Sequence, residues 1–239
     1  MSPQPLVSIG LPVYNGEKHL SRALSTLLAQ DYADFELIIS DNNSKDSTAE
    51  ICREFEARDS RIRYIRQAEN HGAPRNFVFV LEQAQGEFFM WAAHDDWWDP
   101  SYIGKCLTTL QAHPEAVLAC TEVNFVDGED KPSPYLIGWK NLDTSGMDPV
   151  ARVHQMIARM GWYAIYGLMR SEAIRSVKSV GRSVFGSDVL ILMEFILMGH
   201  FVKIPETLFN YRIVKPKSAA DFQADFNSEK CRLPPTPVP

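Results

Sequence analysis

Short apolar runs alternate with amphipathic segments along the first half of the chain. The runs typical of buried strands cover residues 6–13, 35–40, 61–66 and 87–93. Between them, residues 20–28, 48–58 and 74–84 carry apolar side chains at the spacing of helices. This alternation of strand and helix predicts an α/β protein, with a mostly parallel sheet covered by helices on both faces. Ligands bind beyond the carboxyl ends of such strands, so the residues that follow each strand are the candidate site.

The second half of the chain has a less regular pattern. We expect a connection containing Pro and Gly over residues 126–148, followed by a helix over residues 149–160. An aromatic segment over residues 162–166, an apolar helix over residues 188–198 and a strand over residues 200–212 complete the prediction.

Composition and charge narrow the class of protein. The chain has 239 residues, of which 45% are hydrophobic and 23% charged, which is ordinary for a folded protein. Its net charge of -6 gives no overall field that attracts nucleic acid, so we expect no nucleic-acid partner. Apolar runs are too short to span a bilayer, the N-terminal residues lack signal-peptide features, and the four cysteines are scattered. These features predict a cytoplasmic location.

Polar residues follow three of the predicted strands. They are Pro12 to Asn15, Asp41 to Ser44, and His94 to Asp96. Asp41-Asn42-Asn43-Ser44 is a good turn and helix-capping sequence, which is one interpretation of Asp41. The other is a nucleobase site, because Asp41 supplies an acceptor for an imide N–H and Asn42 a donor for a carbonyl.

The order of the motifs resembles that of family 2 glycosyltransferases, which have the GT-A fold. The matching segments are Val7 to Glu17, Phe35 to Ser44, Asn70-His71-Gly72, Arg75-Asn76, Gly86-Glu87-Phe88 and Asp95-Asp96 with Asp99-Pro100. The resemblance spans roughly residues 6–212. It implies a Rossmann-like sheet between helices, with a smaller acceptor-binding part at the C-terminal end.

The resemblance implies a nucleotide site on the first half of the chain. Asp41 and Asn42 would hold the base, usually uracil, although many members carry two acids where this chain has only Asp41. Pro12 and Tyr14 would form a wall against the ribose or base; the alternative is a turn and a core aromatic. Arg75 would contact base carbonyls or phosphate oxygens, and otherwise it is a surface cation.

Asp95 and Asp96 are the predicted metal-binding pair. Carboxylates with open water positions suit Mg or Mn, and such a cation would neutralise a diphosphate leaving group. The common family motif is Asp-x-Asp-Asp, and here Ala93 stands at its first position. We expect Asp96 to ligate the metal, Asp95 to face ribose or metal, and His94 to be structural. The alternative is a cap for the helix after Asp99.

Asp188 is the candidate catalytic residue of the second half. Its position at the start of the predicted helix makes it a candidate N-cap, because aspartate is a preferred residue there. The resemblance instead matches it to the general base of inverting members. Trp162, Tyr163 and Tyr166 either stack on sugar rings or pack in the core. The segment Tyr211 to Val214 lacks the histidine of the family's Tyr-Arg-x-His, so no further metal or diphosphate contact is expected there.

Together, the resemblance implies an inverting transfer from a nucleotide diphosphate sugar, with UDP as the expected nucleotide. The acceptor would be a glycan or lipid-linked glycan in bacterial surface glycan synthesis, with peripheral association at the inner face of the membrane. A nucleotide-sugar-binding scaffold remains an alternative, as does a sugar nucleotidyltransferase, although residues 12–16 lack the Gly-rich basic loop of that class. We expect a nucleotide-sugar half (1–125), an acceptor and catalytic half (126–214) and an extended or disordered Pro-rich tail (215–239).

Overall fold

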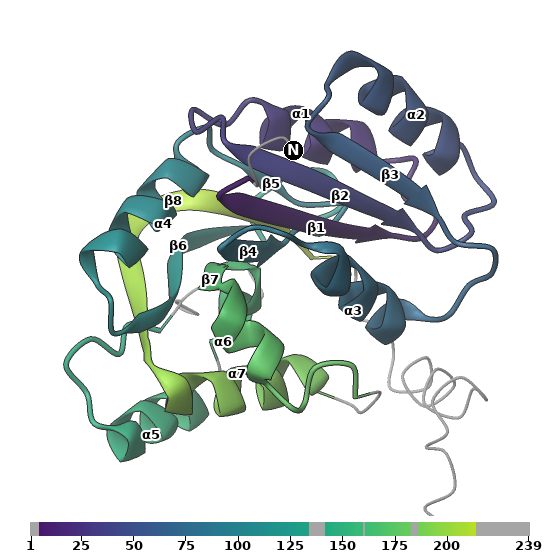
Figure 1. Cartoon of the computed structure of the whole chain (residues 1–239). Coiled ribbons are helices and arrows are strands. Elements are labelled where there is room, and N and C mark those ends of the chain that lie inside the picture. The colour runs from purple at the N-terminus through teal and green to yellow at the C-terminus, as the bar shows by residue number, and fades with distance from the viewer. Residues whose placement is uncertain (1–4, 134–141, 160, 183–185, 214–239) are drawn as a thin grey trace, which may run out of the picture.

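The structure is a computed structural model that describes residues 5–133, 142–159, 161–182 and 186–213. Strands and helices follow one another in the order shown in Figure 1. They are β1 (Val7–Val13), α1 (Leu20–Leu28), β2 (Phe35–Asp41), α2 (Thr48–Arg58), β3 (Ile62–Arg66), α3 (Ala73–Gln83), β4 (Phe88–Trp91), β5 (Trp97–Trp98), α4 (Tyr102–Ala112), β6 (Ala116–Val126), α5 (Pro149–Arg159), the 3-10 helix η2 (Trp162–Tyr166), β7 (Leu168–Arg170), α6 (Ser171–Ser176), α7 (Ser187–Met198) and β8 (His200–Arg212).

The strands form one mixed sheet in the order β3-β2-β1-β4-β7-β6-β8-β5. Pairing is parallel for β1 with β2 and β4, for β2 with β3, and for β6 with β8. Short strands β7 and β5 run antiparallel to their neighbours. The predicted α/β fold with a mostly parallel sheet is therefore confirmed. The same sheet contains strands from both sides of residue 125, the expected boundary between the two halves of the chain.

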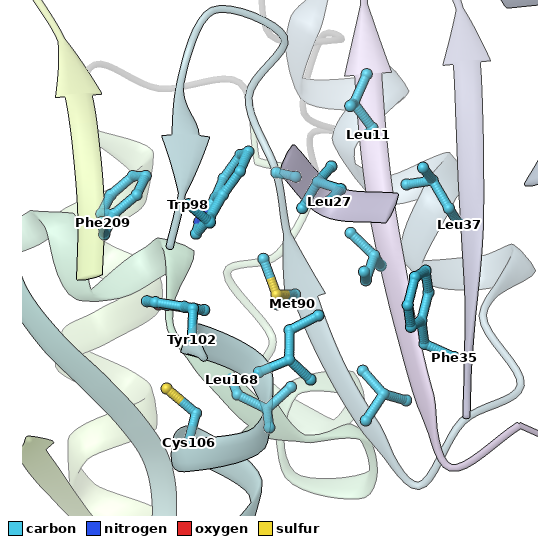
Figure 2. Packing of buried hydrophobic residues seen from close by; sticks show 14 of the residues in the cluster. Leu11, Leu27, Phe35, Leu37, Met90, Trp98, Tyr102, Cys106, Leu168 and Phe209 are labelled. Atoms are coloured by element: carbon cyan, nitrogen blue, oxygen red, sulfur yellow. The ribbon is translucent and has the colours of Figure 1, made fainter. Parts of the chain in front are cut away.

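Alternation along the central strands supplies apolar side chains to both faces of the sheet. In β4, Phe88 and Met90 face the core beneath α1 and α4, whereas Phe89 and Trp91 face the core on the side of α3 and α7. Figure 2 shows the first of these cores, in which Trp98 stacks on Phe209 with ring centroids 5.5 Å apart. Both faces of β4 are covered, so its sequence is a continuous apolar run.

Helix α3 packs directly on β1 at Gly10. A Cβ atom at this glycine would lie 2.7 Å from Cγ2 of Val80 and 2.9 Å from Cζ of Phe89. Only a residue without a side chain allows this approach. Gly10 therefore fixes the distance of α3 from the sheet, and with it the position of the residues at the start of α3.

The second half differs from its prediction mainly in its strands. The pattern gives no strand over residues 116–126, yet β6 lies there and pairs with β8 along ten residues, with three register shifts. Part of the predicted connection 126–148 and the whole predicted tail 215–239 lie outside the described residues. Among the residues that are described, no helix is long and apolar enough to cross a bilayer.

Candidate functional site

The turns after β1 and β2 lie side by side at the carboxyl edge of the sheet. Val13 pairs with Asp41 in the strand register, and the backbone N–H of Asn42 donates to the carbonyl of Val13 at 2.9 Å. Asn15 and Asn43 both have positive φ, at 52° and 62°, which asparagine tolerates better than most residues. The predicted convergence of these two polar clusters is therefore present.

Asp41 is fully buried and both its carboxylate oxygens accept hydrogen bonds. Oδ1 accepts from the backbone N–H of Ser44 at 2.8 Å, and Oδ2 accepts from the hydroxyl of Tyr64 at 2.9 Å. These contacts match the interpretation of Asp41 as a residue that stabilises the turn. Tyr64 was not predicted, because its place in the middle of β3 gives no functional signal.

Asn42 fixes the loop that leads into α3. Its amide Nδ2 donates to Oδ1 of Asn70 at 2.9 Å and to the carbonyl of Gly72 at 3.2 Å, and its Oδ1 accepts from the backbone N–H of His71 at 2.9 Å. These three bonds hold the start of α3 at the strand edge, and the predicted residue Arg75 lies in the first turn of this helix.

A cavity of about 180 Å³ lies between this loop and α3. Its lining is Asn42, Gln67, His71, Arg75, Asn76, Val78, Phe79 and Glu82. The Arg75 side chain is exposed, and its guanidinium makes no hydrogen bond or ion pair with the residues that the structure describes. A free cation that borders a polar cavity fits an electron-rich ligand group such as a base carbonyl or phosphate oxygen.

The structure places Pro12 and Tyr14 differently from each other. Pro12 is buried in β1, beyond Gly10, where the pairing with β4 ends, so its missing N–H leaves no partner unsatisfied. Tyr14 is 44% exposed just past the end of the strand. Neither residue lines the two cavities described in this section. Their predicted contact with ribose or base remains a prediction.

Asp96 is the most unusual carboxylate of the candidate site. Only 1% exposed, it accepts a 2.8 Å hydrogen bond at Oδ1 from the backbone N–H of Arg212, while Oδ2 has no hydrogen-bond partner. Burial, together with the neighbouring charge of Asp95, raises the pKa of Asp96 well above the usual range. An unsatisfied buried oxygen of this kind is costly unless a ligand completes its coordination.

Arg212 holds the Asp95–Asp96 pair in place. Its Nε donates to the carbonyl of Asp95 at 3.0 Å, its Nη1 to the carbonyl of Asp127 at 3.0 Å, and its Nη2 pairs with Asp130 at 2.5 Å. Sequence reasoning named the segment from Tyr211 but gave Arg212 no role. The sequence signal for Arg212 was its position as the arginine of the family's Tyr-Arg-x-His motif.

These groups are compatible with a divalent cation. The open Oδ2 of Asp96 and the adjacent carboxylate of Asp95 are hard oxygen donors, and Mg is commonly held by one or two carboxylates together with substrate phosphates. In the described part of the chain, no cluster of three or more His, Cys, Asp or Glu residues could hold a metal without such a substrate. His94 packs close to Gly16, where a Cβ atom would lie 2.8 Å from Cδ2 of the histidine, and its structural role remains a prediction.

Asp188 lies in the first turn of α7 and lines a second cavity of about 250 Å³. The other residues of this lining are Ala73, Pro74, Phe77, Val78, Trp91, Ile165, Tyr166, Val180, Gly181, Arg182, Ser187 and Ile191. The carboxylate is open to solvent but surrounded by the cavity walls, and the resulting desolvation raises its pKa. The two cavities flank the start of α3, and Val78 lines both.

The prediction that Asp188 is the N-cap is wrong. Gly186 occupies that position with φ of 71°, no side chain caps the helix, and the helix begins at Ser187. The left-handed glycine lets the chain turn into the helix one residue earlier than the pattern indicates. Asp188 is therefore free of the capping contact that would occupy its carboxylate.

Two tyrosines connect Asp188 to the Asp95–Asp96 pair. Burial raises the pKa of Tyr166 and of Tyr211, and the charges of all three carboxylates raise both further. The two rings lie 6.0 Å apart between centroids. Tyr166 lines the same cavity as Asp188, and the residue after Tyr211, Arg212, donates its backbone N–H to Asp96, so the two tyrosines link the cavity of Asp188 with the acidic pair.

The aromatic side chains of residues 162–166 differ in how deeply they are buried. Trp162 and Tyr166 are half-buried, whereas Tyr163 is 1% exposed and packs between Phe125 and Tyr211. The core interpretation therefore describes Tyr163. Stacking on a ligand ring is geometrically open only to Trp162 and Tyr166 of the three.

Comparison with known proteins identifies relatives of this arrangement. The family model described as "Glycosyl transferase family 2" matches residues 8–166. An uncharacterized glycosyltransferase of Rickettsia typhi is 36% identical over 106 residues, which are 44% of this chain and 32% of the relative. The putative glycosyltransferase EpsH of Bacillus subtilis is 34% identical over 123 residues, 52% of this chain and 36% of EpsH. The chain thus spans about a third of these relatives.

Solved structures show the same fold at low sequence identity. Staphylococcus aureus TarS 1–349 in complex with UDP-GlcNAc has a TM-score of 0.69 at 14% identity, covering 88% of this chain and 59% of TarS 1–349. The mannosyltransferase PcManGT of Pyrobaculum calidifontis, in complex with GDP-Man and Mn2+, has a TM-score of 0.62 at 14% identity, covering 90% of this chain and 59% of PcManGT. By its sequence match and its fold, the chain belongs to glycosyltransferase family 2 and has the GT-A architecture.

Proposed function

We propose that this protein transfers a sugar from a nucleotide diphosphate sugar, with UDP as the nucleotide, to an acceptor hydroxyl with inversion at the anomeric carbon. The observation that carries the proposal is a series of contacts from Asp188 to Asp96. Tyr166 lines the cavity of Asp188, its ring lies 6.0 Å from that of Tyr211, and the backbone N–H of the next residue, Arg212, donates to Asp96. These contacts support a base and a cation site that would act on the same donor beside the α3 cavities. The solved relatives bind UDP, UDP-GlcNAc and GDP-Man, which supports a nucleotide-sugar donor.

The nucleotide would lie along the carboxyl edge of the sheet. Asn42 and Arg75 border the smaller cavity, where the guanidinium is free to bind a carbonyl or phosphate oxygen. Asp41 acts through the turn it holds, and Pro12 and Tyr14 flank the same edge. Asp95 would face the ribose or the cation.

Chemically, the transfer needs a base on the acceptor and a stabilised leaving group. The acceptor oxygen forms a bond to the anomeric carbon while the bond from that carbon to the diphosphate oxygen breaks, and the nucleoside diphosphate leaves with the electron pair. Asp188 accepts the hydroxyl proton, and its raised pKa makes it a stronger base than an ordinary aspartate. Mn or Mg held by Asp96 and Asp95 would neutralise charge on the departing diphosphate.

The acceptor would be a glycan of a bacterial surface polymer, free or lipid-linked. Streptococcus pneumoniae GlyA, 33% identical over 97 residues, covering 41% of this chain and 14% of GlyA, carries a glycosyltransferase name, as does EpsH. Half-buried Tyr166 lines the cavity of Asp188 and is placed to stack on an acceptor sugar, with half-buried Trp162 in the same 3-10 helix as a second candidate.

A panel of UDP, GDP and dTDP sugars with Mn tests the proposal in two steps. Thermal stabilisation identifies the donor, and release of nucleoside diphosphate in the presence of a glycan acceptor measures transfer. Asp188→Asn should retain donor stabilisation and lose about 100-fold or more of transfer. Donor binding without any nucleotide release would instead assign the scaffold role, to which Ala93 at the first motif position points. Release of pyrophosphate from UTP and a sugar phosphate would assign nucleotidyl transfer.

A further inference from the structure

Asp130 connects two arginines that are far apart in the sequence. Its Oδ1 pairs with Nη2 of Arg212 in β8 at 2.5 Å, and its Oδ2 pairs with Nη1 of Arg22 in α1 at 2.7 Å. Both guanidinium carbons lie near the ring of Trp97 in β5, at 5.2 Å from the ring centroid for Arg212 and 3.6 Å for Arg22. We call these four residues the Asp130 cluster. Because Trp97 directly follows Asp96 in the chain, the cluster lies next to the candidate cation site.

A tight turn after β6 presents Asp130 to the arginines. The backbone N–H groups of Glu129 and Lys131 donate to Oδ1 of Asp127 at 2.8 and 3.0 Å, and the backbone N–H of Asp130 donates to the carbonyl of Asp127 at 3.2 Å. Asp130 has a φ of 65°, in the left-handed region that aspartate and asparagine tolerate better than most residues. The side chain of Asp127 thus holds the turn, and the carboxylate of Asp130 is left to pair with the arginines.

Arg212 has a buried charge that needs a partner. Its side chain is 2% exposed, and its Nε and Nη1 donate to the neutral backbone carbonyls of Asp95 and Asp127. Within the described ranges, Asp130 is the only carboxylate that forms an ion pair with this guanidinium. A buried guanidinium deprived of its carboxylate is costly, and its planar fork binds carboxylates well. Without Asp130, the guanidinium would be free to pair with the acidic side chains of Asp95 and Asp96, whose backbone Arg212 already contacts.

We propose that Asp130 is a positioning residue for the candidate cation site. By pairing with Arg212, it keeps the guanidinium off the carboxylates of Asp95 and Asp96 and leaves them to the cation. Burial opposes the ionisation of Asp130, but the hydrogen bond and charge of Arg212, and then the charge of Arg22, lower its pKa, so this carboxylate is charged at neutral pH. The inference rests on the proposed function, because the cation site belongs to that reaction.

Calorimetry of UDP binding, in chelator and over a series of Mn concentrations, tests the inference. Mn should raise the affinity of the wild type for UDP, and Asp130→Asn should need about 10–100-fold more Mn for the same gain, the usual effect of losing a residue that orients metal ligands. In chelator both proteins should bind UDP equally, since Asp130 lines neither cavity. Asparagine tolerates the positive φ of this position, so the turn should be retained. In transfer assays the KM for Mn should rise by the same factor, while kcat at saturating Mn should stay near that of the wild type.

Two control variants separate the charge of Asp130 from other effects. Asp127→Asn removes a carboxylate of the same turn that does not pair with Arg212, and Arg22→Gln removes the exposed partner of Asp130. Neither should change the Mn requirement. An equal loss in Asp127→Asn would overturn the inference by assigning the effect to the general field of the turn. An equal loss in Arg22→Gln would overturn it by assigning the effect to packing on Trp97.

An unchanged Mn requirement in folded Asp130→Asn would also overturn the inference, and a lower Tm without that change would assign the ion pair to stability alone. The wild type distinguishes this failure from that of the proposed function. If Mn adds nothing to UDP binding by the wild type, the proposed cation site fails and the inference fails with it. A Mn effect that the wild type shows and Asp130→Asn fully retains refutes this inference alone.

Discussion

Replacing Asp96 with asparagine should make the metal-free protein more stable and abolish its response to metal. An asparagine keeps the acceptor for the backbone N–H of Arg212 but removes a buried charge whose Oδ2 has no partner. The asparagine amide that replaces Oδ2 is still a buried polar group without a partner, but a buried charge costs more than a neutral group, whose cost is about 1–3 kcal/mol, so we expect Asp96→Asn to gain about 1–2 kcal/mol at neutral pH. For a chain of this length that corresponds to a rise in Tm of about 2–8 °C.

The gain should depend on pH in a defined direction. Burial raises the pKa of Asp96 in the folded state, so the folded protein binds this proton more tightly than the unfolded chain does. The contribution of Asp96 to stability is therefore fully present below the unfolded pKa of about 4, and it is lost as pH rises through the raised folded value. The difference in unfolding free energy between variant and wild type should grow across that window.

Chemical denaturation in chelator across a series of pH values measures this difference. At neutral pH, Mn should add to the stabilisation that UDP alone gives the wild type, and this additional effect of Mn should be absent from Asp96→Asn. Asp99→Asn is the control, because hydrogen bonds from the backbone and hydroxyl of Ser101 hold the pKa of this exposed carboxylate low. Its contribution is lost as pH falls, with the opposite sign. Parallel pH curves for the wild type and Asp96→Asn would refute the reasoning.

Three further predictions concern the rest of the site. Because desolvation raises the pKa of Asp188, the acid limb of the pH–rate profile for transfer should have its midpoint above the ordinary aspartate value, and a limb near 4 would contradict this. Arg75→Ala should leave the Tm of the free protein unchanged and weaken donor binding by about tenfold or more, measured by calorimetry, with Lys45→Ala as the exposed-cation control. Tyr64→Phe should remove about 1–2 kcal/mol of unfolding free energy through Asp41, while an unchanged denaturation midpoint would show that this bond contributes nothing.

The first half of the fold could be predicted from the sequence because its signals are local. Strands such as β1 and β2 are continuous apolar runs, and the intervening helices repeat their apolar side chains every three or four residues. By contrast, β6 begins as a fully buried run and continues half-buried, a pattern that does not separate strand from helix. Its assignment depends on pairing with β8, which no local spacing reveals.

The candidate site was predictable where chemistry follows a strand and unpredictable where it depends on distant contacts. Asp96 comes shortly after β4, and this position was enough to predict it as a metal ligand. Its bond to Arg212 joins residues 116 positions apart, and such a separation leaves no periodic trace in the sequence. The same holds for Tyr211, whose ring lies 6.0 Å from that of Tyr166, 45 positions earlier in the chain.

The hydrogen bond from the backbone N–H of Arg212 to Asp96 also affects the order in which the parts of the protein fold during synthesis. During synthesis, the ribosome must add more than a hundred residues after Asp96 before the chain that positions this carboxylate exists. Strand β8 must then find its place between β6 and β5, a long-range pairing that is slow to form. A nascent chain that has completed β1 to β4 would therefore have the proposed nucleotide edge but not the complete proposed cation site. Capacity to bind nucleotide would precede capacity for chemistry, so catalytic competence would arise only when the last strand of the sheet is in place.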